Sequence, residues 1–173
     1  YELVKLSEKI GLKVPSYIYV DKVDQVLPHL TFPVIVKPVS SAQIINGKYF
    51  GYKVILSKGK ENLIDTLREL VPKTPVMIQE YIDGYGIGYN VYCTDGEVKS
   101  EFIHKRLNEN EGVSSYRKII PIGSYDIRDK VQQLLNEIKW NGVAMVEFKV
   151  DKNGIPYLME MNGRFFGSTE LGV

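Results

Sequence analysis

The stretch that decides the fold is residues 142–168, GVAMVEFKVDKNGIPYLMEMNGRFFGS. Apolar and polar residues alternate on both sides of Asn153-Gly154, the strongest short signal for a β-hairpin. With these two residues at the centre of the turn, Lys152 faces Ile155, and further along the strands Glu147 faces Glu160. The stretch therefore predicts two paired strands with two glutamates side by side.

Opposed side chains on paired strands have Cβ atoms about 4.5–5.5 Å apart, and like charges placed in this way are destabilising. Asn162 follows Glu160 by two residues and so points to the same face. Two carboxylates and an amide oxygen are hard ligands of the kind that Mg²⁺ or Mn²⁺ prefers. We therefore expect Glu147, Glu160 and Asn162 to form a metal site. Arg164, two residues further on, has the planar fork of donors that suits a phosphate.

A second interpretation of the same hairpin stays open. Both glutamates can be solvated surface residues, with Arg164 an ordinary surface arginine. A turn of another type would also shift the register by one residue.

The composition sets limits on the class of protein. The 173 residues carry a formal net charge of +1, which suggests neither a nucleic-acid-binding surface nor an acidic tail. No apolar run approaches the roughly 20 residues of a membrane span, and no signal peptide is evident. The single cysteine, Cys93, is interpreted as a buried thiol, so a cytoplasmic location is expected. Tyr1 is not an initiator Met, and the pattern is interrupted at Val173, so both ends look truncated.

Earlier segments show a buried-type strand and a following loop. Residues 32–38, FPVIVKP, form an apolar strand that ends in Lys37, held extended by the next proline. The ammonium of Lys37 either reaches solvent or points toward a polyphosphate. The loop from Ser40 to Gly51 contains only two glycines, Gly47 and Gly51, which is a poor composition for a phosphate cradle.

The glycine-rich stretch DGYGIG at residues 83–88 follows another strand, residues 76–82. A strand pattern comes next, with no helix to bind a pyrophosphate, so a dinucleotide-binding fold is rejected. We interpret these glycines as a hinge between two lobes. Asp95-Gly96 predicts a second hairpin, whose second strand ends on the basic triplet His104-Lys105-Arg106, either a solvated face or a phosphate contact. Helical spacing predicts three helices, over residues 3–10, 61–71 and 125–139.

Four of these segments, in the same order along the chain, resemble the ATP-grasp family, particularly its carbamoyl-phosphate-synthase-like branch. They are residues 32–38, the segment Gln79-Glu80-Tyr81-Ile82, residues 104–106, and Glu147 together with residues 160–164, EMNGR. The resemblance implies an α+β ATP-grasp fold with nucleotide bound between two lobes, here residues 1–83 and 84–173.

The resemblance also implies roles for individual residues. Lys37 corresponds to the lysine that contacts ATP phosphates, and the backbone of Glu80 and Ile82 to the adenine-binding hinge. The other residues implied to contact the nucleotide are Gln79, Tyr81, Asp83 and Leu158. Glu147, Glu160 and Asn162 correspond to the Mg²⁺ ligands. The residues implied to stabilise the transferred phosphoryl group are Arg164, Lys105 and Arg106.

The activity implied is that of an ATP-dependent carboxylate-amine ligase, acting on small-molecule carboxylate and amine substrates. ATP and Mg²⁺ (or Mn²⁺) are the implied cofactors, with no nucleic-acid or membrane partner. Two alternatives remain, a nucleotide-binding or structural module without ligase activity and a small-molecule kinase on the same fold. The sequence identifies neither the acceptor substrate nor the oligomeric state.

Overall fold

The computed structural model describes residues 1–25, 28–40, 42–45, 47–110, 113–165 and 167. The chain divides into two compact units. Unit 1 comprises Tyr1 and Pro15–Tyr81, and unit 2 comprises Glu2–Val14 and Ile82–Val173. The boundary was predicted after residue 83 and falls after Tyr81, and the N-terminal helix, predicted in the first lobe, belongs to the second unit. No helix in the described ranges is long and apolar enough to cross a membrane.

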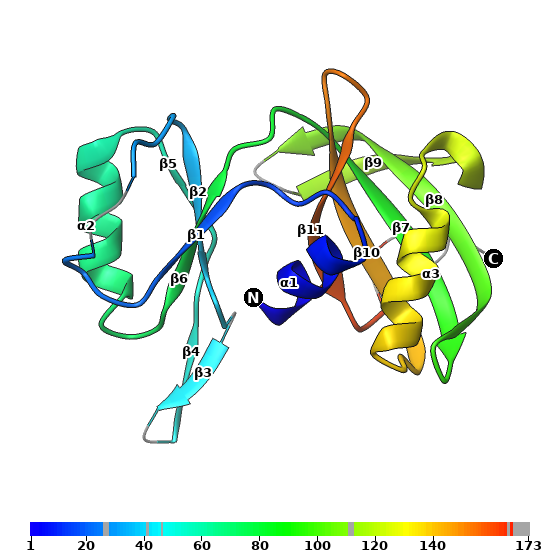
Figure 1. The fold of residues 1–173 in the computed structure, drawn as a ribbon, viewed down its shortest axis with the longest axis horizontal. Helices are drawn as coiled ribbons and strands as arrows, with labels where there is room; N and C mark the ends of the chain where they lie inside the picture. Colours follow the sequence, from blue (N-terminus) through cyan, green and yellow to red (C-terminus); the bar gives the residue numbers. More distant parts are fainter. Residues whose placement is uncertain (26–27, 41, 46, 111–112, 166, 168–173) are drawn as a thin grey trace. The chain divides into compact units, whose positions relative to one another are not determined.

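Unit 1 is an antiparallel four-stranded sheet covered on one face by a helix (Figure 1). The strand order is β1-β6-β2-β5, and the bounds are β1 Tyr17–Val20, β2 Val34–Pro38, β5 Ile55–Ser57 and β6 Val76–Glu80. Helix α2, Lys60–Leu70, buries Leu63, Leu67 and Leu70, whose spacing puts them on one helical face. These leucines pack on Val34, Val36 and Ile78, so the core of unit 1 lies between α2 and the sheet.

The segment from Ser40 to Gly51, expected to be a loop, contains instead a two-stranded hairpin, β3 Ala42–Ile45 and β4 Lys48–Gly51. Ile44 and Tyr49 are cross-strand partners and are 76% and 75% exposed. The alternating β-prone residues form the two strands, and Gly47 has a positive φ (74°) in the turn between them.

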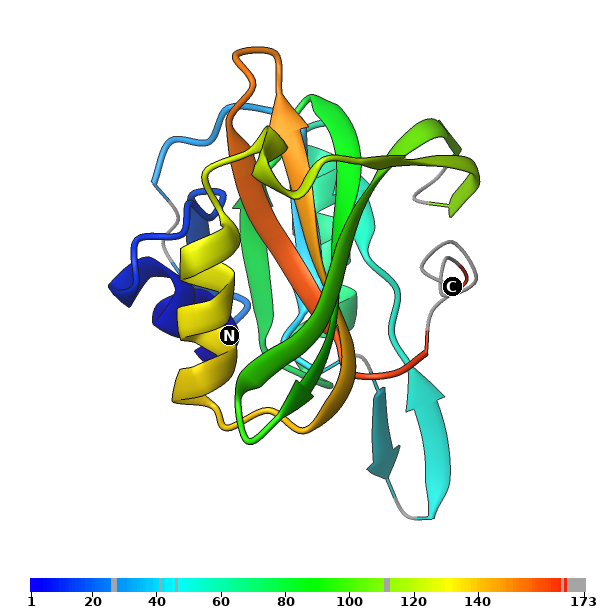
Figure 2. The same cartoon turned by 90° about the vertical axis from the view of Figure 1, so that its right-hand side faces the viewer.

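Unit 2 is an antiparallel five-stranded sheet in the order β11-β10-β7-β8-β9. The bounds of its strands are β7 Gly84–Thr94, β8 Glu97–Asn110, β9 Val113–Ile120, β10 Gly142–Asp151 and β11 Pro156–Asn162. Helices α1, Glu2–Lys9, and α3, Arg128–Glu137, cover the same face of this sheet (Figure 2), and a short 3₁₀ helix η1, Ile122–Ser124, precedes α3. The three predicted helices are confirmed, each within three residues at either end.

Alternation along the strands of unit 2 separates two faces. Ile87, Tyr89 and Val91 on β7 and Val146 and Phe148 on β10 are buried in the core beneath the helices. The residues between them point to the opposite face. We call this the polar face, defined by Gly88, Asn90, His104, Glu147 and Glu160.

The glycines at residues 84–88 belong to β7, so their interpretation as a hinge loop is wrong. Two of them are required by close packing inside the sheet. A Cβ atom on Gly84 would lie 1.9 Å from the carbonyl oxygen of Val150, and one on Gly88 would lie 2.4 Å from the His104 ring. The composition therefore reflects crowding between strands and not backbone freedom.

The β10–β11 hairpin brings Glu147 opposite Glu160, as predicted, although the predicted turn is wrong. The backbone N–H of Asp151 donates to the carbonyl oxygen of Ile155, so Lys152 does not face Ile155. Near the turn the register is shifted by one residue, and an irregularity between Glu147 and Phe148 shifts it back.

Candidate functional site

The polar face carries a row of four consecutive cross-strand partners. His104, Gly88, Glu147 and Glu160 lie on β8, β7, β10 and β11 respectively. In the neighbouring row, Met145 lies opposite Asn162. The hairpin therefore places all three predicted metal ligands on one face of one sheet.

Glu147 is the centre of this arrangement, because both of its carboxylate oxygens have partners. Oε2 forms an ion pair with Nη2 of Arg106, and the two side chains are each 13% exposed. Oε1 accepts a hydrogen bond of 2.9 Å from Nδ2 of Asn162. The same Nδ2 donates to Oε1 of Glu160 at 2.9 Å. One amide nitrogen thus bridges the two glutamates and offsets their repulsion.

The donor set fits a hard divalent cation. One oxygen from each glutamate is within reach of a single atom, the Asn162 nitrogen, and the amide oxygen of Asn162 becomes a third donor if the amide is turned over. Oxygen ligands at about 2.0–2.1 Å suit Mg²⁺. No cluster of three or more His, Cys, Asp or Glu side chains suited to a metal occurs in the described part of the chain, so a two-carboxylate site with an amide is the candidate.

His104 is the β8 member of the row. From the sequence, it was named only as part of the basic triplet at residues 104–106. Its ring is 1% exposed and lies over Gly88, with Nδ1 3.0 Å from Nδ2 of Asn90. Burial, followed by the charges of Arg117 and Arg106, lowers the pKa of His104 to about 4. The ring is therefore neutral near pH 7, and the Asn90 contact assigns its proton to Nε2.

The structure separates the two other members of the basic triplet. Arg106 lies on the polar face against Glu147, whereas the ammonium of Lys105 lies 3.5 Å from the centre of the Tyr85 ring. Adjacent residues of a strand point to opposite faces. The two side chains therefore lie on opposite faces of the sheet, and the phosphoryl contact expected of Lys105 stays a prediction. The Tyr85 hydroxyl is itself 2.7 Å from the hydroxyl of Tyr125.

Two further predicted residues lie close to the row in sequence. Arg164 follows β11, is exposed, and donates from Nη1 to the carbonyl oxygen of Phe165 at 3.1 Å. Leu158 is 0% exposed and belongs to the core of unit 2, so its assignment as a nucleotide contact is wrong. The register shift beside Phe148 places Leu158 opposite that core residue instead of on the polar face.

In unit 1, Lys37 and Gln79 lie on the sheet face turned away from α2. Val34 and Val36 face the helix, and Lys37 alternates with them. Its cross-strand partner Met77 shares this face with Gln79, which is 2% exposed. Nε2 of Gln79 has no hydrogen-bond partner among the residues that the structure describes. Lys37 thus lies on the sheet face that carries a buried, unsatisfied amide.

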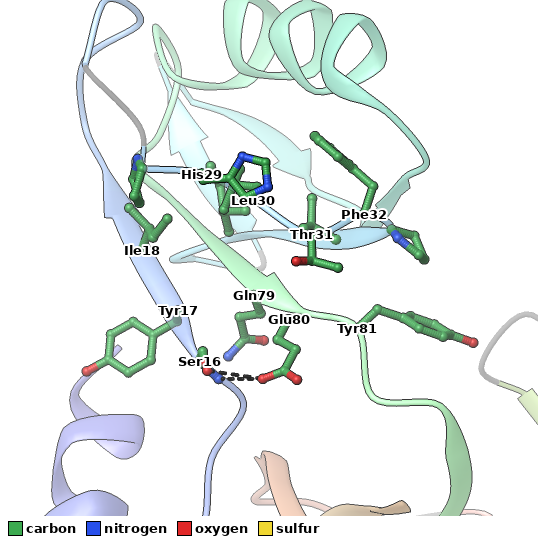
Figure 3. Close-up of a pocket in the computed structure, with 14 residues that line it drawn as sticks. Ser16, Tyr17, Ile18, His29, Leu30, Thr31, Phe32, Gln79, Glu80 and Tyr81 are labelled. Carbon is green, nitrogen blue, oxygen red and sulfur yellow. Dashed lines mark hydrogen bonds between the residues drawn. The ribbon is translucent and has the colours of Figure 1, made fainter.

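The predicted hinge residues also border a cavity of about 490 Å³ in unit 1 (Figure 3). Glu80 forms part of its wall, and its carboxylate accepts hydrogen bonds from the hydroxyl of Ser16 at 3.0 Å and from the Ser16 N–H at 3.4 Å. Tyr81, 39% exposed, also lines it, whereas Lys37 does not. Ile82 is buried and Asp83 exposed at the start of unit 2.

Sequence reasoning missed two residues of the polar face, Asn90 and Arg117. Asn90 is 1% exposed, and its Nδ2 also donates to the carbonyl oxygen of Gly88 at 2.8 Å. A polar residue inside an apolar alternating strand was the available signal. Arg117 lies directly opposite Arg106 across the β8–β9 ladder. No signal was available for it, since two irregularities of register precede that pair.

Comparison with known proteins agrees with this architecture, although no protein-family model matches the chain. The carbamoyl phosphate synthase large chain of Sulfolobus acidocaldarius is 25% identical over 175 positions, which cover 92% of this chain and 16% of that protein. The structure of the RiPP-associated ATP-grasp ligase of Chryseobacterium gregarium with ADP superposes with a TM-score of 0.65 at 14% identity, covering 95% of this chain and 51% of that one. The chain has the ATP-grasp fold.

A further structure with this fold is closer in sequence. The D-alanine–D-alanine ligase of Bacillus anthracis complexed with ATP has a TM-score of 0.69 at 24% identity, over 99% of this chain and 54% of that one. The predicted α+β ATP-grasp fold is confirmed. The chain spans between about one sixth and just over half of the length of these proteins.

Proposed function

We propose that this chain is the Mg²⁺-dependent nucleotide-binding part of an ATP-dependent ligase that joins a carboxylate, or carbonate, to an amine. The observation that carries the proposal is the hydrogen-bonded cluster on the polar face, in which Glu147, Glu160 and Asn162 gather on an ATP-grasp fold. The ATP- and ADP-bound proteins that share the fold support the choice of nucleotide.

In a reaction of this class, a carboxylate oxygen attacks the γ-phosphorus of ATP and ADP leaves. The amine then attacks the acyl carbon, phosphate leaves, and the amine loses a proton to solvent. ATP supplies the activated phosphoryl group, and Mg²⁺ neutralises charge on its oxygens. Protein groups contribute mainly by position and by fixed charge.

This chain's own residues divide between those tasks. Glu147, Glu160 and Asn162 would hold the cation, and Arg106 and Arg164 would face phosphoryl oxygens. Lys37 would contact phosphates from unit 1. The backbone of Glu80 and Ile82 would contact the adenine edge, with Gln79, Tyr81 and Asp83 beside it. Cytoplasmic location is part of the same proposal, in keeping with Cys93 as a buried reduced thiol.

The test uses the intact protein with ATP, Mg²⁺ and a panel of carboxylates combined with amines. ADP release that requires both substrates, together with a product whose mass equals their sum less one water, supports a ligase. ADP release with a phosphorylated product and no condensation would replace the ligase by a kinase. Absence of turnover with every pair, alongside normal nucleotide binding, would overturn the proposal.

One observation favours a second candidate, a nucleotide-binding module without ligase activity. The hairpin β3–β4 presents exposed Ile44 and Tyr49 in the segment whose composition is poor for a phosphate cradle. Such a hairpin offers fewer backbone N–H groups to an anion, because they are paired within the ladder. The same product analysis separates this candidate from the ligase.

A further inference from the structure

Two arginines lie directly opposite each other beside the metal ligands. Arg106 and Arg117 are Cα partners on β8 and β9, and both point to the polar face. Like charges in this arrangement are destabilising unless an anion lies between or beside them. The β8–β9 ladder therefore contains a local repulsion between two positive charges, which a nearby anionic group would offset.

In the structure, the carboxylate of Glu147 neutralises one of the two arginines. Its Oε2 pairs with Nη2 of Arg106, and both side chains are 13% exposed. The charge of Arg117 acts on the buried ring of His104 and lowers its pKa. One arginine is thus neutralised by the carboxylate that is also the central candidate for metal binding.

A cation that uses both oxygens of Glu147 cannot bind without two rearrangements. Arg106 must leave Oε2, and the Asn162 amide, which donates to Oε1 and to Glu160 at 2.9 Å, must present its oxygen. Removing Arg106 alone would leave a nearly buried carboxylate without a counter-charge, which is strongly unfavourable. Arg106 and the divalent cation are therefore alternative counter-ions of one carboxylate.

We propose that Arg106 and Arg117 form a binding site for phosphoryl oxygens that becomes available when a divalent cation replaces Arg106 at Glu147. The inference rests on the proposed function for the identity of the cation and adds a second arginine and a sequence of events. Before exchange, Arg106 is neutralised by Glu147. After exchange, two adjacent guanidinium groups attract a tetrahedral oxyanion, for which their planar donor forks are suited.

The cation and the anion both bind to the state in which Glu147 has released Arg106. Their binding is therefore coupled, and the coupling is reciprocal. An anion on the arginine pair favours the state in which Glu147 has released Arg106, so it tightens cation binding. A cation on Glu147 tightens anion binding by the same factor. Metal and phosphate would therefore arrive together, and Glu147 would have a counter-ion in both states.

The first measurement is a titration of the nucleotide-free protein with Mn²⁺. The electron paramagnetic resonance signal of free Mn²⁺ reports how much of the ion is bound. Arg106→Gln removes the competing charge, so we expect Mn²⁺ to bind about 10-fold more tightly, equivalent to about 1.4 kcal/mol. Arg106→Lys retains a cation and should stay within about 3-fold of the wild type. Unchanged or weaker Mn²⁺ binding by Arg106→Gln, in protein with normal circular dichroism, would overturn the proposal.

The second measurement repeats the titration with sulfate, a tetrahedral dianion that binds Mn²⁺ weakly. Sulfate should tighten Mn²⁺ binding to the wild type by about 5-fold, at the low end of typical couplings. Arg117→Gln should abolish that effect. Lys118→Gln is the matched control, because Lys118 is the next residue, carries the same charge, and points to the opposite face.

Coupling that survives in Arg117→Gln, or that is lost equally in Lys118→Gln, would refute the anion site. Absence of Mn²⁺ binding in every variant would refute it as well. These outcomes do not depend on ligation, which is followed separately by product mass. A ligase without metal–sulfate coupling would disprove only this inference, and coupling without ligation would disprove only the proposed function.

Discussion

Replacing Gly88 with alanine should destabilise unit 2, and the structure specifies why. Gly88 lies between His104 and Glu147 in the polar-face row. A Cβ atom there would lie 2.4 Å from Cε1 and 2.9 Å from Nε2 of His104, and 3.0 Å from the sulfur of Met145. The imidazole has little room to move, because it is 1% exposed and its Nδ1 contacts Asn90 at 3.0 Å.

The change in the free energy of unfolding caused by Gly88→Ala follows from two opposing effects. Overpacking of a well-packed site usually costs about 1–3 kcal/mol. Alanine also restricts the unfolded chain relative to glycine, which stabilises by about 0.4–1 kcal/mol where the native backbone accepts it. Gly88 does not have a positive φ, so this gain applies. We expect a net loss of about 1–2 kcal/mol.

The single tryptophan, Trp140, packs against the core of unit 2, so its fluorescence in a urea titration reports the unfolding of that unit. Gly123→Ala is the control, because a Cβ atom on Gly123 meets nothing within 4 Å. In a His104→Ala background the clash with the imidazole is absent and only the flexible Met145 side chain must shift, so Gly88→Ala should then cost much less or be neutral. An equal loss in both backgrounds, or a loss below about 0.5 kcal/mol in the wild type, would refute the reasoning.

Three further predictions concern the same unit. The pKa of His104 is lowered to about 4 from an unfolded value near 6.5, so stability should fall by up to about 3 kcal/mol as the pH drops from 6.5 to 4, and His104→Gln should remove this part of the pH profile. Leu158→Ala should cost about 2–5 kcal/mol by Trp140 fluorescence, since the side chain is 0% exposed in the core. Glu160→Gln should weaken Mn²⁺ binding by about tenfold or more, measured by calorimetry, while exposed Glu137→Gln should leave it unchanged.

Local patterns predicted the elements well, because their causes are local. Leu63, Leu67 and Leu70 recur at helical spacing, and α2 buries all three. Asp95-Gly96 predicted the β7–β8 hairpin, and both residues have positive φ, 49° and 81°. In each case, the residues that carry the signal are within a few positions of the structure they determine.

Features that depend on distant partners were not predictable in the same way. Helix α1 packs against unit 2, although the chain continues from it directly into unit 1. The crowding at Gly84 and Gly88 comes from Val150 and His104, which lie 66 and 16 residues further along the chain. A glycine that is required by a neighbour looks the same in the sequence as one that is required by a turn. The hinge interpretation failed for this reason.

The meeting of Glu147 and Glu160 shows which constraint governs the register of the central hairpin. The turn differs from the two-residue turn that was assumed, and it shifts Phe148 against Leu158. If that shift continued along the strands, one strand would turn its apolar residues out of the core, because side chains alternate with a period of two. Leu158 is buried in the core and Met161 packs against that core although the two are three residues apart on β11, and the irregularity between Glu147 and Phe148 allows this. Burial of the apolar face thus fixed the pairing of the two glutamates, and the turn adapted to it.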